Sequence, residues 1–117
     1  AASRQFSDAA KYPELLRVCG VGADVVAPMM AVVDHIGWKR VGIVYVDDAW
    51  GRDTQRIVAH GFKQSAISLA VHRTPQHNPP DSDAEFREAA EHMKKKRVRV
   101  LFIILHLWDA LSFYTQL

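Results

Sequence analysis

Residues 37–53 place the tightest limits on how this chain folds. Gly37 readily accepts the left-handed conformation in which many helices end. Residues 41–46 form a short apolar run with several β-branched side chains, which is typical of a strand buried on both faces of a parallel sheet. Residues 47–53 then bring three carboxylates, a tryptophan and a glycine to the end of that strand. Because ligands bind at the carboxyl ends of strands in open α/β sheets, this loop is the first candidate for a site.

The rest of the sequence alternates strand patterns with amphipathic helix patterns. Strands are expected at residues 15–19, 41–46, 67–72 and 98–106, and helices at residues 24–36 and 51–65, from Asp81 or Ser82 onward, and at residues 108–117. Helices between successive strands imply right-handed crossovers. The predicted fold is therefore α/β, a parallel sheet flanked by helices on both faces. Residues 67–72 alternate as in a strand near an edge, whereas residues 98–106 are predicted to be buried.

The spacing of apolar residues predicts which helical positions face the core. Asp24 is the expected N-cap of the first helix, and Pro28 is tolerable only in its first turn or at a kink. The expected inward positions are Val25, Met29, Val32, Val33 and Ile36, then Ile57, Val58 and Phe62, and then Phe86, Ala89, Ala90 and Met93. Residues 20–22 are expected to form a turn, and residues 74–82, with three prolines, a surface loop.

Composition excludes some kinds of partner and site. The 15 basic and 13 acidic side chains leave a net charge of +2, which is too balanced to indicate nucleic-acid binding. The basic run at residues 94–97 ends a predicted helix, where cations complement the helix dipole. Cys19 is the only cysteine, so neither an internal disulfide nor a cysteine-based metal site can form. We interpret Cys19 as a small buried residue.

The sequence shows neither a membrane span nor a signal peptide. No apolar run approaches the ~20 residues that a spanning helix needs. The first residues lack the charged and then apolar pattern of a signal peptide. Because the sequence starts without methionine and ends inside an amphipathic segment, we expect a fragment whose membrane attachment lies in other segments.

Local chemistry gives little support for an enzyme. Asp47 and Asp48 suit the Mg²⁺ site of a receiver domain, but Asp109 lies too far along to be the phosphoacceptor at a later strand end. Acids that cap the following helix are the favoured interpretation. The six histidines lack metal-ligand spacing, and His106 either faces a cleft or is a hydrogen-bonded structural residue. We therefore predict no catalytic residue, no metal and no cofactor.

Trp50 is the residue of this loop best suited to contact a ligand. It lies between acids and beside Gly51 at the tip of the predicted central strand, on a loop where an aromatic side chain is poorly placed for the core. Its large apolar face could stack on a ligand. A hinge or interface role for Trp50 is equally compatible with the sequence.

Three blocks of sequence, taken together, resemble the receptor family ligand-binding region. They are Tyr-Pro-Glu-Leu-Leu-Arg-Val at residues 12–18, His-Ile-Gly-Trp-Lys-Arg-Val at residues 35–41 and Tyr-Val-Asp-Asp-Ala-Trp-Gly-Arg-Asp at residues 45–53. This family is the bilobed Venus flytrap module of type I periplasmic binding proteins. It occurs in natriuretic-peptide receptor cyclases, metabotropic glutamate and GABA type B receptors, and the amino-terminal domains of ionotropic glutamate receptors. The similarity runs from about residue 2 to residue 117.

The resemblance implies two lobes and a ligand in the cleft between them. Residues 1–17 would end the first lobe and approach the hinge, and residues 18–117 would form an incomplete second lobe. The predicted ligand-binding residues are Ser3, Gly22 and Trp50, at positions that the resemblance indicates, together with Asp48 and Gly51 from the loop after the central strand. Ser3 keeps the hydroxyl and Trp50 the stacking aromatic of amino-acid-binding members, but Gly22 lies in a turn where those members carry an aspartate. A peptide or another small molecule therefore remains as open as an amino acid.

The function implied is an extracellular ligand-binding module of a membrane receptor, which signals by hinge closure and works as a receptor dimer. It would lie at the extracellular face of the plasma membrane, and an effector such as a cyclase could lie elsewhere in a longer chain. The alternatives are a substrate-binding protein of a bacterial transporter and a cytosolic receiver or flavodoxin-like domain. A further alternative is a degenerate module that serves only for dimerisation, through the helix at residues 27–36 or through Trp108.

Overall fold

The computed structural model describes residues 7–18, 22–75 and 82–117. Its regular elements are η2 (Gly22–Val25), α1 (Val26–Ile36), β1 (Arg40–Val46), α2 (Ala49–Gln64), β2 (Ser68–Thr74), α3 (Ser82–Lys95), β3 (Val100–Ile104) and α4 (Leu107–Tyr114). From β1 onward, each strand is followed by a helix, as the sequence predicted.

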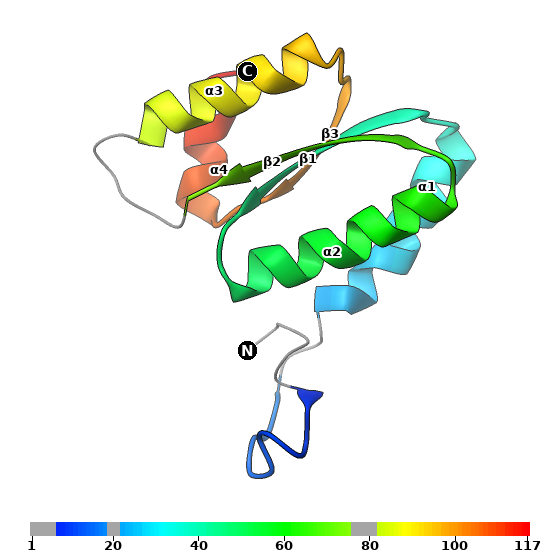
Figure 1. Cartoon of the computed structure of the whole chain (residues 1–117), viewed down its shortest axis with the longest axis vertical. Coiled ribbons are helices and arrows are strands. Elements are labelled where there is room, and N and C mark those ends of the chain that lie inside the picture. The colour runs from blue at the N-terminus through cyan, green and yellow to red at the C-terminus, as the bar shows by residue number, and fades with distance from the viewer. Residues whose placement is uncertain (1–6, 19–21, 76–81) are drawn as a thin grey trace.

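The strands form one open parallel sheet in the order β2-β1-β3. β1 is central, so that Ile43 lies beside Val71 of β2 and Phe102 of β3. Figure 1 shows α1 and α2 on one face of the sheet and α3 and α4 on the other. The predicted α/β fold is therefore confirmed. Since the chain passes from β1 to β2 and then to the far side of β1, the strand order reverses at β1.

Side chains of β1 alternate between two hydrophobic clusters, one on each face of the sheet. Val41 and Ile43 enter the first cluster, and Val44 and Val46 enter the second. The buried members of the first are Val26, Val33, Val41, Ile43, Val58, Ala59, Phe62, Ile67 and Ile104; those of the second are Val44, Val46, Phe86, Ala89, Ala90, Met93, Leu105 and Phe113. This double-sided burial explains the continuous apolar sequence of β1. All four inward positions predicted for the helix now seen as α3 are confirmed.

Three helices end on a left-handed residue just before the next strand. These residues are Gly37 (φ 80°), Ala66 (φ 55°) and Arg97 (φ 55°). In each case the amide of the next residue donates to the carbonyl five positions earlier, at 3.1–3.3 Å, which is the hydrogen bond of a Schellman turn. The prediction that Gly37 ends a helix in this conformation is confirmed.

The strand predicted at residues 15–19 is not formed in the described part of that segment. Residues 15–18 have no regular structure, and Leu16 and Val18 are 85% and 95% exposed. A strand depends on hydrogen bonds to a neighbour, and none of the described strands pairs with this segment. Cys19 lies outside the described residues, so its predicted burial stays a prediction.

The first helix also differs from the prediction. Asp24 lies inside η2, and the N-cap of α1 is Val25, with no side-chain hydrogen bond. Val33 is buried as predicted, but Val25, Val32 and Ile36 are 52–55% exposed. The buried residues of α1 are Val26 and Val33, seven positions apart, so its inward face is narrower than the predicted stripe and leaves Val32 and Ile36 outside it.

β3 is shorter and more exposed than predicted. It spans Val100–Ile104, and Ile103 is 39% exposed. Because β3 pairs only with β1 among the described strands, it is an edge strand, and the prediction of a buried strand at residues 98–106 is wrong. The prediction of an edge position for the preceding strand, seen as β2, is confirmed. α2 begins at Ala49, two residues before the predicted start, because Asp48 caps it.

Candidate functional site

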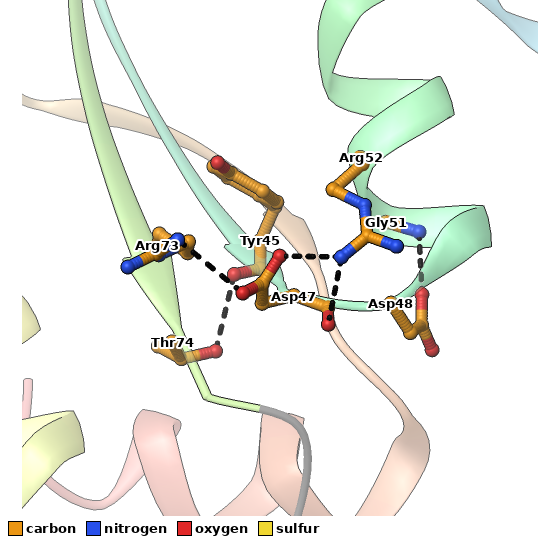
Figure 2. Close-up of polar contacts among 7 residues, drawn as sticks. All are labelled: Tyr45, Asp47, Asp48, Gly51, Arg52, Arg73 and Thr74. Carbon is orange, nitrogen blue, oxygen red and sulfur yellow. Dashed lines mark hydrogen bonds and ion pairs between the residues drawn. The ribbon is translucent and has the colours of Figure 1, made fainter.

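The candidate site lies at the carboxyl edge of the sheet, where the loop after β1 is tied to its neighbours. The Asp47 amide donates to the Thr74 carbonyl of β2 at 2.9 Å, and the Asp48 amide donates to the Val46 carbonyl at 3.0 Å. The buried hydroxyl of Thr74 donates to the Tyr45 carbonyl at 3.1 Å. Figure 2 shows how this last bond ties the end of β2 to β1 beside the loop. The position of the loop is therefore set by the sheet.

Asp48 joins the ends of β1 and β3. Its Oδ1 accepts a hydrogen bond from the Gly51 amide at 2.7 Å and so caps α2. Its Oδ2 lies 2.8 Å from Nε2 of His106, the N-cap residue of α4. Because a carboxylate can only accept, His106 donates from Nε2 in this contact. The prediction that an acid of this loop caps the following helix is confirmed for Asp48.

The surroundings of Asp48 favour its ionised form. Burial by itself would raise the pKa of Asp48. The hydrogen bond from the Gly51 amide, the hydrogen bond and charge of His106, and the charge of Arg52 outweigh burial and lower the pKa below its ordinary value. Asp48 is therefore an anion at neutral pH, with both oxygens engaged by protein donors.

Asp47 faces away from Asp48 and lies between two arginines. Its Oδ1 is 2.9 Å from Nη1 of Arg52, and its Oδ2 is 3.4 Å from Nη1 of Arg73. Figure 2 shows the Asp47 carboxylate between the two guanidinium groups, with Asp48 directed toward Gly51 instead. Since both arginines are well exposed, each pair contributes at most about 1 kcal/mol. The two aspartates thus have separate protein partners and do not converge on one shared position.

Trp50 is the second residue of α2, so the prediction that it lies on a loop is wrong. Its half-buried side chain packs against both hydrophobic clusters, so the prediction that an aromatic here is poorly placed for the core is wrong. The physical reason is that α2 begins directly over the end of β1, where the two clusters come close together. The Trp50 ring also lies 5.3 Å from the His106 ring, centroid to centroid.

Gly51 is buried where α2 crosses the end of β1. A Cβ atom at this position would collide with the Val46 carbonyl oxygen and lie 2.9 Å from Val46 Cγ1. Glycine therefore lets the helix approach the strand closely enough for its amide to reach Asp48. This packing role is independent of any contact between Gly51 and a ligand, which stays a prediction.

Three of the predicted site residues lie together, and two do not belong to this group. Asp48, Trp50 and Gly51 are adjacent at the start of α2. Ser3 lies outside the described residues. Gly22 begins η2, ahead of α1, and its predicted ligand contact stays a prediction.

Sequence reasoning missed several members of this site. Arg52, Arg73 and Thr74 were not predicted as site residues, and His106 was left open between a cleft position and a structural role. The hydrogen bond to Asp48 supports the structural role of His106, while its side chain remains 58% exposed. A signal for the pairing was present, because residues that follow two parallel strands meet at the same edge of the sheet.

Three side chains of different chemistry meet at this edge. Trp50, His106 and Asp48 bring an aromatic face, an imidazole and a carboxylate into contact. Among residues 7–18, 22–75 and 82–117, no group of three His, Cys, Asp or Glu side chains could hold a metal ion. Stacking and hydrogen bonding are therefore the interactions that these side chains offer.

A family model described as the receptor family ligand binding region matches residues 1–114. A search of curated proteins finds no match. None of the described helices combines the length and the apolar character that crossing a membrane requires.

Proposed function

Because this chain belongs to the receptor family ligand-binding region, we propose that it is part of an extracellular ligand-binding module of a membrane receptor at the plasma membrane. In this proposal, residues 1–17 end the first lobe and approach the hinge, and residues 18–117 belong to the second lobe. A small molecule or a peptide binds between the lobes. Closure of the hinge on the ligand then transmits the signal to the rest of the receptor.

The observation that supports this proposal best is the contact between Asp48 and His106 across the carboxyl edge. Asp48 follows β1, His106 follows β3, and their side chains meet at 2.8 Å. The strand order reverses at β1, and ligands of open α/β sheets bind in the crevice at such a reversal. Trp50 lies against the same imidazole. Three side chains with different chemistry thus converge where the fold favours a ligand.

Each of these side chains has a distinct role in the proposal. Trp50 offers aromatic surface for stacking. His106 is more than half exposed and offers ring nitrogen for hydrogen bonding. Asp48 orients His106 and caps α2, so it acts mainly by holding the other two in place. Gly51 allows the close approach on which this geometry depends.

We further propose that the receptor works as a dimer. α1 carries Val32 and Ile36, which are 53% and 52% exposed, and α4 carries Trp108, which is 76% exposed. An interface that removed these side chains from water would gain about 25 cal/mol per Å² of apolar surface. Sedimentation velocity over a wide concentration range is expected to show a dimer that Val32→Glu weakens. A monomer at every concentration would contradict this part of the proposal.

The binding site is tested by a thermal-shift screen of the complete bilobed module, which supplies both walls of the cleft, against free amino acids and short peptides. A compound that binds the folded state raises Tm, and the affinity of each hit is then measured by calorimetry. Trp50→Ala is expected to weaken binding about tenfold, since it removes roughly 1.4 kcal/mol of aromatic contact. Trp108→Ala, which removes an equally large but exposed ring from α4, is the matched control and should leave affinity unchanged.

Two results would refute the proposal. If Trp50→Ala folds, as judged by circular dichroism, and binds a confirmed hit as tightly as the unmodified chain, the site is wrong. If the complete transcript encodes no signal peptide, no preceding lobe and no membrane span, the receptor assignment is wrong. His106→Ala, which truncates a more exposed side chain, gives a second measure of the site if Trp50→Ala does not fold.

A further inference from the structure

A hollow of about 850 Å³ lies at the amino-terminal edge of the sheet, opposite the site described above. Its walls come from the turns that lead into the strands, including residues 37–40 before and at the start of β1, Ser68 of β2, and Arg97 and Arg99 before β3. Its volume falls within the range of roughly 300–1,000 Å³ that small-molecule sites occupy. No residue of this hollow takes part in the Trp50 site, so the two can be tested separately.

Four cationic side chains line this hollow: Lys39, Arg40, Arg97 and Arg99. All four are exposed, and no aspartate or glutamate is among the described residues that line the hollow. Within the part of the chain that the structure describes, none of the four has an ion pair or a side-chain hydrogen bond. Cations without a protein counter-charge repel one another, and a bound anion would relieve that repulsion.

The backbone holds these cations on well-defined turns. The Ser68 amide donates to the Lys39 carbonyl at 2.9 Å, and Arg40 is paired with Ser68 in the sheet. On the other side, Arg97 lies in the Schellman turn that ends α3, and Arg99 directly precedes β3. The charge of Arg40 is thus carried by the first residue of β1, and the other three charges lie on the short turns that lead into β1 and β3.

Arg97 reaches the hollow from the turn that ends α3. Its φ of 55° is a left-handed conformation, which is unfavourable for a residue with a Cβ atom. Gly37 occupies the equivalent position in the turn after α1 and avoids this cost. Ala66 has the same φ in the turn after α2, so this conformation comes from the way the helices end. Of these three turn residues, Arg97 is the one that brings a charge to the hollow.

Helix dipoles oppose an anion here, but they are outweighed. The C-termini of α1 and α3 end at this edge, and each carries about half a negative charge. Some of the terminal carbonyl groups that produce this negative charge already accept hydrogen bonds in the Schellman turns, from the amides of Trp38 and Val98. The four formal positive charges of the lining exceed the two half-charges of the helix ends.

We propose that this hollow binds a ligand that carries clustered phosphate or sulfate groups. Guanidinium groups match the oxygen geometry of both anions, and Lys39 adds a point charge. Trp38 lines the hollow and packs against the first hydrophobic cluster, so it gives the ligand a fixed apolar wall. The proposal does not depend on the receptor function, because it concerns the opposite edge of the sheet.

The test is calorimetric titration of the purified chain with inorganic pyrophosphate and, separately, with sucrose octasulfate, at low and high sodium chloride. We expect saturable binding that weakens with salt. Arg97→Gly should raise Tm, because it relieves the left-handed strain, while it weakens binding about fivefold. Ala66→Gly is the matched control: it relieves the same φ of 55° at the end of α2 but removes no charge, so only Tm should change.

A charge reversal gives the second measurement. Arg99→Glu is expected to weaken binding about tenfold or more, whereas Arg56→Glu, an exposed position in the middle of α2, should not. Tighter binding of pyrophosphate identifies a phosphorylated ligand, and tighter binding of the octasulfate identifies a sulfated one. The proposal is overturned if neither compound binds at low salt, or if Arg97→Gly and Arg99→Glu bind as the unmodified chain does.

Discussion

Replacing Asp48 with alanine removes two hydrogen bonds from the start of α2 at once. The first is the N-cap bond from the Gly51 amide to Oδ1, at 2.7 Å. The second is the bond from His106 Nε2 to Oδ2, at 2.8 Å, which joins two segments 58 residues apart. Asp48→Ala thus tests how much the loop after β1 depends on this one carboxylate.

The two losses differ in size because their surroundings differ. Loss of an N-cap costs about 1 kcal/mol, with a range of roughly 0.5–2, and burial of Gly51 favours the upper half because its amide loses a partner away from water. The His106 side chain is 58% exposed, so solvent screening limits its bond to at most about 1 kcal/mol. Together they predict a destabilisation of about 2 kcal/mol, or a Tm lowered by about 10 °C.

Urea unfolding followed by circular dichroism gives the free energy of unfolding for each variant. Asp48→Asn should cost less than half as much as Asp48→Ala, since asparagine caps a helix about as well as aspartate does. A double-mutant cycle with His106→Ala isolates the pairwise energy, expected at or below about 1 kcal/mol. If Asp48→Asn destabilises as much as Asp48→Ala, capping is not the main role of Asp48 and this reasoning fails.

The loss of folding stability at low pH provides an independent check on the role of Asp48. The folded-state pKa of Asp48 lies below its ordinary value of 3.8, so its stabilising effect is present above that pH and is lost as the pH falls through the folded-state pKa. The unmodified chain should therefore lose more stability than Asp48→Ala on acidification below about pH 4. Parallel acid curves for the two proteins would contradict the assignment of an ionised, hydrogen-bonded Asp48.

Two further predictions concern packing and pH. Gly51→Ala should destabilise the fold by about 1–3 kcal/mol in urea unfolding, because the new methyl group collides with the backbone of β1. This cost exceeds the gain from alanine as the better helix former. Equal or higher stability would contradict the close approach of α2 to β1. Burial, and then the charge of nearby His92, lower the pKa of His72 against the effect of Glu88, so the free energy of unfolding falls as the pH drops below 6.5. His72→Gln should reduce this fall, whereas the control His35→Gln should not. Equal slopes of the unfolding midpoint from pH 7.5 to about 5.5 would refute the assignment.

Local patterns in the sequence were sufficient for the central elements. The apolar run of β1, the left-handed Gly37 and the amphipathic face of α3 each depend on neighbours within a few residues, so their outcome could be predicted. The prediction for residues 15–19 failed because a strand needs a partner, which its own sequence does not supply. The prediction for Asp24 failed because η2 and α1 divide one amphipathic pattern between two helical periods.

The composition of the candidate site was only half visible in the sequence. Asp48, Trp50 and Gly51 were selected because they follow the central strand, and the structure brings them together at the start of α2. The partner of Asp48 was not selected: the order of strands and helices indicates that His106 reaches the same edge, but its local sequence does not specify which carboxylate it meets there. Burial of Trp50 was mispredicted for the same reason, because it depends on both clusters that surround the end of β1.

By itself, the sequence determined the class of fold, the end of α1 at Gly37 and the family, because these follow from short-range periodicity, capping and linear motifs. The tertiary structure decided the strand order β2-β1-β3, the pairing of Asp48 with His106 and the convergence of four cations from separate turns. Each of these features joins residues that are distant along the chain, and they meet only because parallel strands bring all their carboxyl ends to one edge and all their amino ends to the other.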